Sequence, residues 1–206
     1  MLMELITEPA ALPLDAEDVR ARLNLGDDLS DDVLEAYIKA ATGQIDGWDG
    51  WLGRALVQQQ WRMTLQCFPC ESLRIPLPPL ISVDDIKYFD SAGTQQTWPD
   101  DQYRTVGQYL VPNNGISFPA TQWRADAIQI EFTAGYGDDG ADVPEPIRQA
   151  ICLTVSNLRS ISAQNLFISQ ETVDGVGSTQ YIVGGNAGAA IDAAVMSLLS
   201  TYRVFA

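Results

Sequence analysis

The sequence contains no histidine and few basic residues, with 12 Lys and Arg against 27 Asp and Glu and a formal net charge of −15 at pH 7. Without histidine, the chain by itself can form neither a Ser-His-Asp nor a Cys-His catalytic centre, and it lacks the commonest metal ligand. The shortage of cations argues against general nucleic-acid binding, which depends on Lys and Arg to neutralise phosphates. It also disfavours docking on an anionic membrane surface.

Long hydrophobic runs are absent as well. No stretch approaches the roughly 18 uncharged apolar residues that mark a membrane-spanning helix, so we expect no membrane segment. Residues 1–9 contain neither a basic region nor an apolar run of signal length, so we expect no secretory signal peptide.

Cysteine is scarce, since the chain contains only Cys67, Cys70 and Cys152. An odd number of cysteines in a chain of this size does not make a disulfide framework, which points to a reducing compartment such as a cytoplasm. Cys67 and Cys70 have the C-x-x-C spacing of redox sites. Because Cys67 continues the apolar alternation of residues 61–65, we expect it to face inward from a strand and the cysteines to be structural.

The sequence does contain enough apolar residues for a folded core. Hydrophobic residues make up 46% of the 206 residues, and charged residues make up 19%. Disorder requires low hydrophobicity together with high charge, so wholesale disorder is not expected. This length allows one domain, or one domain that carries an insertion.

Helical periodicity marks the N-terminal part of the chain. Asp15 is a candidate N-cap for a short helix over residues 16–23. Ser30 then begins a longer helix, whose apolar positions continue to Leu52 and whose predicted stop is Gly53.

The apolar period then changes from about 3.6 residues to 2. Alternating apolar residues, bounded by turn residues, predict strands over residues 61–67, 73–77, 83–89, 103–111 and 128–132. Because these strands form one block and do not alternate with helices, a doubly wound parallel sheet is not expected. The sequence therefore predicts an α+β fold of about four helices, with a helical domain at residues 1–54 and 140–206 and an inserted antiparallel β domain at residues 55–139.

Helical periodicity returns over residues 147–158 and again over residues 191–202. Between them, residues 160–190 are polar and glycine-rich, with two short β-like runs. Residues 184–188 follow a β-like run and precede a helix, yet their spacing matches neither a dinucleotide fingerprint nor a Walker loop. We interpret them as a flexible hinge.

No group of residues has the spacing of a catalytic, cofactor-binding or metal site. The acidic residues Asp138, Asp139, Asp142 and Glu145 cluster in a Gly/Asp loop, but their spacing is not that of a calcium loop. We interpret them as a solvated loop with anions near a helix N-terminus.

The five tryptophans form no linear stacking motif. Trp48 and Trp61 lie on apolar faces and are expected in the core. Trp98 and Trp123 fall in loops of the β block, where they could be interface anchors.

Several segments follow one pattern when they are taken together. They are residues 15–25, 34–41, 53–56, 60–65, 68–69, 75–83, 130–137, 143–151 and 198–203. Together they resemble the head-tail connector (adaptor) proteins of long-tailed bacteriophages, in the branch with a β insertion between two helices. The resemblance covers nearly the whole chain in the right order. The glycine-rich residues 170–190 and the three residues after Arg203 depart from the family pattern.

The resemblance implies a structural virion protein without catalytic activity or cofactor, assembled in the host cytoplasm. About a dozen copies would form a ring beneath the portal protein at the capsid vertex, since heterologous contacts close into a ring. The ring would continue the DNA channel and offer a platform to a stopper or tail-completion protein. An acidic lumen would repel phosphates, so double-stranded DNA could pass without sticking.

Three surfaces are expected on this basis, with the β domain at the ring periphery. The expected portal-binding surface consists of Leu198, Leu199, Tyr202, Arg203, Val204 and Phe205. An inter-subunit or lumen loop would present Phe167, Val173, Val176 and Tyr181. Residues 1–53 carry twelve acids against three bases, and the acidic channel-facing candidates are Asp27, Asp28, Asp31, Asp32 and Glu35. For Leu198, Leu199 and Tyr202, simple packing on the helix at residues 147–158 is an equal alternative.

Other function classes stay open from the residues alone. A stopper or tail-completion protein would share the neck location. An acidic cytoplasmic binding protein, such as a nucleic-acid mimic, would share the charge and would remain monomeric at any concentration. An enzyme has the least support, because no constellation of residues points to one.

Overall fold

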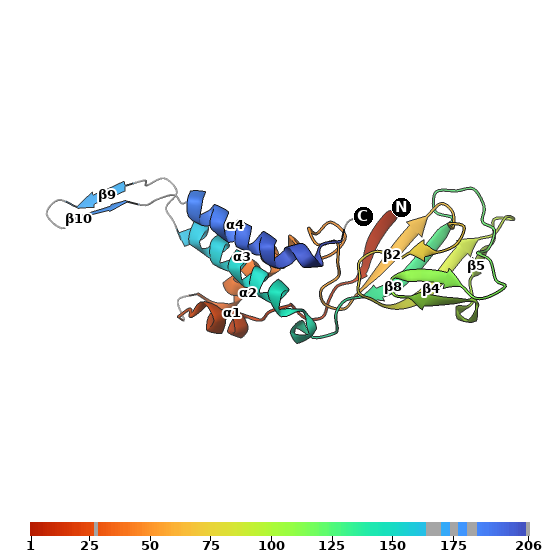
Figure 1. The fold of residues 1–206 in the computed structure, drawn as a ribbon, viewed down its shortest axis with the longest axis horizontal. Coiled ribbons are helices and arrows are strands. Elements are labelled where there is room, and N and C mark those ends of the chain that lie inside the picture. Colours follow the sequence, from red (N-terminus) through yellow and green to blue (C-terminus); the bar gives the residue numbers. More distant parts are fainter. Residues whose placement is uncertain (27–28, 164–169, 174–176, 181–184, 205–206) are drawn as a thin grey trace. The chain divides into compact units, whose positions relative to one another are not determined.

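The computed structural model describes residues 1–26, 29–163, 170–173, 177–180 and 185–204 (Figure 1). The chain divides into two compact units. The first, here called the β unit, consists of Met1–Pro13, Gly43–Val143 and Arg203–Ala206. The second, here called the helical unit, consists of Leu14–Thr42 and Pro144–Tyr202.

The β unit contains two antiparallel sheets. The larger has the strand order β1-β2-β8-β4-β5, with β1 at Leu2–Thr7, β2 at Gln59–Leu65, β8 at Ile128–Ala134, β4 at Leu80–Phe89 and β5 at Gln95–Thr97. The smaller has the order β3-β7-β6, with β3 at Leu73–Arg74, β7 at Tyr109–Pro112 and β6 at Tyr103–Val106. Two 3-10 turns, η1 at Asp100–Gln102 and η2 at Gly140–Asp142, complete this unit.

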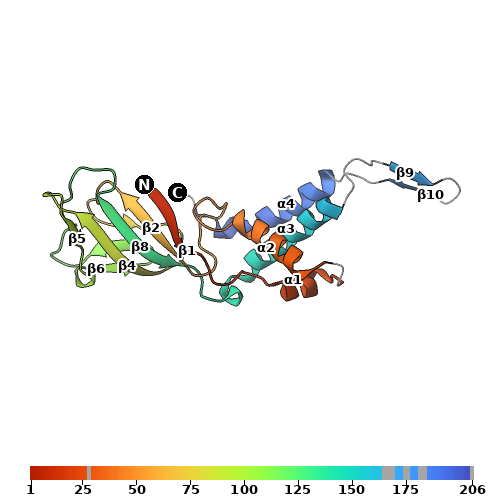
Figure 2. The same cartoon turned by 180° about the vertical axis from the view of Figure 1, so that it is seen from behind.

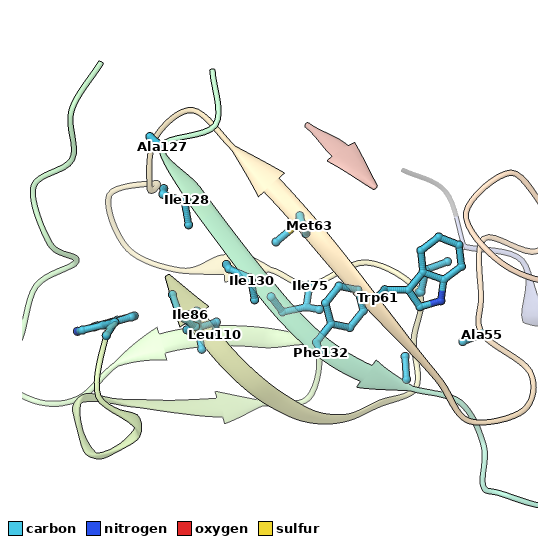
Figure 3. Close-up of a cluster of buried hydrophobic side chains, with 13 residues drawn as sticks. Ala55, Trp61, Met63, Ile75, Ile86, Leu110, Ala127, Ile128, Ile130 and Phe132 are labelled. Atoms are coloured by element: carbon cyan, nitrogen blue, oxygen red, sulfur yellow. The ribbon is translucent and has the colours of Figure 1, made fainter. Parts of the chain in front are cut away.

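The core of the β unit lies between the two sheets. Successive side chains of a strand point to opposite faces, and β2 and β8 accordingly alternate between buried and half-buried positions. The buried side chains from the larger sheet meet Ile75 and Leu110 from the side of the smaller sheet (Figure 3). The members from the larger sheet are Trp61, Met63, Ile86, Ile128, Ile130, Phe132 and Ala134.

The outer face of the larger sheet carries charge. Arg62 of β2 lies opposite Glu4 of β1 and Glu131 of β8, and its guanidinium is 3.0 Å from the first carboxylate and 2.7 Å from the second. Asp85 of β4 lies opposite Glu131 in turn and pairs with Lys87 at 2.8 Å. The alternation seen in the sequence therefore separates an apolar inner face from a charged outer face.

The helical unit contains α1 at Ala16–Leu23, α2 at Asp31–Gly43, α3 at Glu145–Ala163 and α4 at Gly185–Leu199, followed by the 3-10 turn η3 at Ser200–Tyr202. Asp15 caps α1 by accepting the Asp18 backbone N–H at 2.7 Å. Helix α3 packs on α4 and contacts α1 (Figure 2). Buried apolar residues on these helices are Val19, Leu34, Ile38, Ile147, Ile151, Val155 and Leu199.

Ion pairs join α1 to the start of α3. Arg22 forks onto the carboxylate of Glu145, and Arg148 lies 2.8 Å from Asp18 and 3.3 Å from Glu145. The Arg22 hydrogen bond lowers the pKa of Glu145 below its usual range. The carboxylates therefore complement both the cations and the N-terminal end of α3, where the helix dipole favours anions.

A two-stranded antiparallel ribbon consists of β9 at Gln170–Val173 and β10 at Gly177–Gln180. With the helices and the two sheets, it confirms the predicted α+β class with antiparallel strands. None of the helices described is long and apolar enough to cross a bilayer.

Several local predictions were wrong. The helix that begins at Asp31 ends at Gly43 and does not continue to Leu52. Residues 44–53 form tight turns, in which Gly47 has φ +80° and a Cβ on Gly50 would lie 2.2 Å from the Asp46 carbonyl oxygen. Ile45 and Leu52 are buried in the β unit, so their helical spacing does not correspond to a helix.

Three further features differ from the sequence expectation. Strand β2 ends at Leu65, and Cys67 lies exposed beyond it, so Cys67 is not an inward strand position. Residues 185–188 of the predicted hinge form the first turn of α4. Strands β1 and β5 had not been predicted.

Candidate functional site

The acidic residues predicted to face a channel are partly compensated by nearby cations. Asp31 accepts hydrogen bonds from Arg20 at 2.8 and 3.2 Å, and Arg20 is held in turn by the Gly26 carbonyl at 2.8 Å. Glu35 pairs with Lys39 at 3.4 Å, one turn along α2. The exposed Asp32 lies in the first turn of α2. The remaining candidates, Asp27 and Asp28, lie outside the described residues.

The residues predicted to bind a portal divide between the two units. Leu199 is 1% exposed, so this side chain packs within the chain, in keeping with the alternative interpretation. Leu198 and Tyr202 are half-buried at the end of the helical unit, and Arg203 is exposed in the β unit. Val204 is half-buried, and Phe205 lies outside the described residues.

Arg203 and Val204 are fixed to the turns that follow α2. The Val204 backbone N–H donates to the Leu52 carbonyl at 2.9 Å. The Arg203 guanidinium lies over the Trp51 ring, 4.5 Å from its centroid, which is a cation–π geometry. These contacts hold the C-terminal segment within the β unit.

Beside this contact the β unit has a pocket of about 550 Å³. Its lining is mostly apolar and aromatic and includes Arg74 and Arg203. The residues that form it are Met1, Trp48, Gly50, Trp51, Gly53, Arg74, Pro76, Leu77, Arg203 and Val204. A pocket of this size, apolar with a few charged groups, is typical of binding sites in proteins, which range over about 300–1,000 Å³.

The two loop tryptophans have opposite environments. Trp98 is 3% exposed, its indole N–H donates to Gln102 Oε1 at 2.9 Å, and its ring contacts Phe68, Tyr103 and Phe118. The expectation that Trp98 anchors an interface was therefore wrong, because it belongs to the core. Trp123 is 84% exposed, which keeps it as an interface candidate.

The predicted loop residues contribute little to the described structure. Val173 is the last residue of β9. The other three residues, Phe167, Val176 and Tyr181, lie outside the described residues.

The acidic loop before α3 is a structural turn. Asp139 caps η2 by accepting the Ala141 N–H at 3.1 Å, and Asp142 caps it reciprocally. Gly140 lies against the chain near Leu12, where a Cβ would be 2.3 Å from the Leu12 carbonyl oxygen. No cluster of metal-ligating side chains occurs among the described residues.

Asp46 is a half-buried carboxylate that sequence reasoning missed. Its Oδ1 accepts the Leu56 N–H at 2.8 Å and the Gln59 amide at 3.1 Å, so it links the turns after α2 to the start of β2. Burial raises the pKa of Asp46 above its usual range, while hydrogen bonds from Leu56, Gln59 and Gly47 oppose that rise. Its position among three glycines, at 43, 47 and 50, was the available sequence signal for a turn.

The three thiols are free, with Cys67 and Cys70 exposed and Cys152 buried in α3. Burial raises the pKa of the Cys152 thiol. Only Cys152 therefore has the buried structural environment that the sequence predicted for the cysteines.

Comparison with known proteins gives a likeness in structure. No family model matches the chain, and no curated protein matches it. Among solved structures, a chain in the neck of an empty GTA particle with C6 symmetry aligns with a TM-score of 0.71 at 20% identity. A chain in the virion of a native gene transfer agent particle gives 0.71 at 21%, and one in the neck of a native GTA particle with C12 symmetry gives 0.66 at 19%. Each alignment covers 100% of this chain and 97% of the other, so the fold is shared along the full length.

Proposed function

We propose that this chain is a structural head-tail connector (adaptor) in the neck of a phage-like particle. About a dozen copies would form a ring between the portal and a stopper or tail-completion protein. The observation that carries the proposal is the shared fold over 100% of this chain and 97% of its structural neighbours, which come from GTA necks and a GTA virion. Two of those necks were computed with C6 and C12 symmetry, which is consistent with a ring of that order.

The exposed apolar edge of the β unit supports side-by-side packing of subunits. Strand β1 is at one end of the five-stranded sheet and pairs there with β2. Its apolar residues Leu2 and Leu5 are 66% and 39% exposed. An edge strand with exposed apolar side chains is suited to contact with another chain.

The charge of the chain supports passage of DNA without binding. The net charge is −15, and Asp31, Asp32 and Glu35 lie on exposed or half-exposed positions of α2. Although Asp31 and Glu35 are paired with cations, Asp32 and the overall excess of acid would keep the surrounding potential negative. A lumen lined in this way would repel the phosphate backbone of passing DNA.

Contact with the portal is proposed for the residues near the C-terminus that remain accessible. They are Leu198, Tyr202, Arg203 and Val204. Phe205 lies outside the described residues and stays in the proposed set. Leu199 is withdrawn from this set, because its side chain is buried within the chain itself. The helical unit would contribute Leu198 and Tyr202 to this contact and the β unit Arg203 and Val204, with residues 55–139 at the ring periphery.

Quantitative mass spectrometry of purified particles tests this proposal. We expect the chain in a fixed ratio of about a dozen copies to each portal ring. Particles that lack the chain, or that contain one or two copies of it, contradict the connector role. A soluble chain that stays monomeric and is never found in particles would instead favour an acidic binding protein.

A further inference from the structure

Among the described residues of the β unit, Trp123 is the most exposed large apolar side chain, at 84% exposure. Aromatic side chains contribute 150–250 Å² of contact area each, about the largest of any residue. Tryptophan is also among the residues most enriched at the energetic centres of interfaces. Because the Trp123 indole lies almost fully in solvent, core packing does not explain why a tryptophan occupies this position.

The loop that presents Trp123 is fixed on both sides. On one side, the Gln122 N–H donates to the Phe89 carbonyl at 3.0 Å. On the other, the Arg124 guanidinium lies 3.8 Å from the centroid of the Phe89 ring. Its Nε and Nη2 groups each donate to the Asp126 carboxylate at 2.6 Å. Phe89 itself donates its N–H to the Ala127 carbonyl at 2.9 Å. The backbone at Trp123 is therefore preorganised, which lowers the entropy cost of using its side chain in a contact.

The pocket beside Arg203 has a volume and an apolar lining suited to an indole. Its volume of about 550 Å³ is formed by Trp48, Trp51, Pro76 and Leu77, among other residues. Arg74 and Arg203 are among the lining residues, and the arginine guanidinium is the cation that most often lies on the face of an aromatic ring. Arg203 already forms such a contact within the chain, 4.5 Å from the centroid of the Trp51 ring.

Charge also favours a contact between these two surfaces. The turn next to Gln122 contains the half-buried Asp90, whose carboxylate accepts the Ala92 and Thr94 N–H groups at 2.9 Å each and the Gln96 amide at 3.1 Å. The pocket contributes Arg74 and Arg203. In a chain with a net charge of −15, two copies repel each other unless the contact brings cations of one copy near acids of the other.

We propose that Trp123 of one copy inserts into the Trp48–Trp51–Leu77 pocket of the next copy. This deepens the proposed function and rests on it, because a ring of copies provides a neighbour for every pocket. The contact joins two different surfaces of the same unit, so it is heterologous, and heterologous contacts close into rings when the rotation divides the circle. Since Trp123 and the pocket both belong to the β unit, this unit supplies both halves of the contact.

A photo-crosslinking experiment tests the contact directly. The full chain carrying p-benzoylphenylalanine at position 123 is mixed with 15N-labelled wild-type chain over a concentration series and irradiated. We expect mixed-isotope crosslinks to peptides that contain Trp48 or Trp51, rising with concentration. The matched control carries the same crosslinker at Val106, which is 55% exposed in the same unit, and should not reach these peptides. The proposal is overturned if the mixed-isotope crosslinks map to other peptides, or if none forms at any concentration.

Two substitutions distinguish this contact from nonspecific association of the chain. Trp123→Ala and Trp51→Ala should each weaken self-association in sedimentation equilibrium by at least about tenfold, because both remove an aromatic from the same contact. Together they should weaken it little more than either alone. Additive losses from the two substitutions contradict insertion of one ring beside the other.

The proposed function can fail independently of this contact. Particles assembled with Trp123→Ala and containing the chain at the wild-type number and position would leave the connector role intact and refute the Trp123 contact as a ring interface. Specific mixed crosslinks in a chain that is absent from particles would refute the connector role while the contact between copies stands.

Discussion

The guanidinium of Arg203 lies 4.5 Å from the centroid of the Trp51 ring. This contact joins the last described residues of the chain to turns that begin just after α2, and the Val204 hydrogen bond to Leu52 at 2.9 Å reinforces it. The C-terminal segment is thus part of the wall of the pocket beside Trp48. A change at either residue of the pair therefore alters the pocket as well as the attachment of the C-terminal segment.

A double-mutant cycle measures the strength of this pair. We expect Trp51→Ala and Arg203→Ala to show a coupling of about 0.5–1 kcal/mol in the free energy of unfolding, the range for exposed cation–π contacts. Urea denaturation of the wild-type chain, both single variants and the double variant provides the four values. Arg203→Lys is the control that keeps the positive charge. A coupling near zero means that the stacked geometry contributes nothing to stability.

The two loop tryptophans should respond oppositely to truncation. Trp98→Ala should lower the free energy of unfolding by about 3–5 kcal/mol, because it empties an aromatic site in the core of the β unit. Trp123→Ala should change it by no more than about 0.5 kcal/mol, as for exposed positions generally. Chemical denaturation of the monomeric chain gives both values. Equal losses of unfolding free energy at the two positions would contradict the burial of Trp98 and the exposure of Trp123.

Asp46 should impose a distinctive pH dependence on stability. Its raised pKa means that the folded state binds this proton more tightly than the unfolded state does. The resulting stabilisation is complete below the unfolded pKa of about 3.9 and is lost as the pH rises through the folded pKa. The free energy of unfolding of Asp46→Asn, relative to wild type, should therefore rise with pH across that window. If the free energy of unfolding of Asp46→Asn falls with rising pH relative to wild type, the raised pKa of Asp46 is contradicted.

Asp46→Ala is the companion substitution. It removes the acceptors of the Leu56 N–H and the Gln59 amide, whereas asparagine keeps one oxygen for them. We expect alanine to be about 1–3 kcal/mol less stable than asparagine at the same pH, the cost of leaving buried donors without partners. Equal stability of the two variants means that these hydrogen bonds do not hold the turn.

The thiols should fall into two classes of reactivity. Cys67 and Cys70 are exposed and should react quickly with Ellman's reagent in the native chain, while the buried Cys152 should react only as the helical unit opens. Two fast equivalents and a third released by denaturant are expected. Cys152→Ala should remove the slow class alone, and fast reaction of all three thiols contradicts the burial of Cys152.

The parts of the fold that follow local rules could be predicted from the sequence. Asp15 precedes α1 and caps it as expected, because an N-cap acts on backbone groups three residues away. Strands β2 and β8 alternate in burial as their apolar residues do. The alternation of apolar and polar residues determines which face of each strand packs against the core, so the structure shows the same alternation.

The parts that depend on distant partners could not be predicted. Strand β1 has only one residue that is not exposed, Met3, and exists through its pairing with β2 rather than through a pattern of its own. Ile45 and Leu52 kept a helical spacing by coincidence, since glycines end α2 and both side chains are buried in turns. The two loop tryptophans could not be told apart, because a loop has no period from which burial can be deduced.

The position of the chain in a reconstruction of the intact particle tests the central claim most directly. The account predicts density for this fold in a ring below the portal, with symmetry-related copies in contact through their β units and Arg203 near the portal side. Absence of the chain from the neck contradicts the connector role, as does its presence as a single off-axis copy.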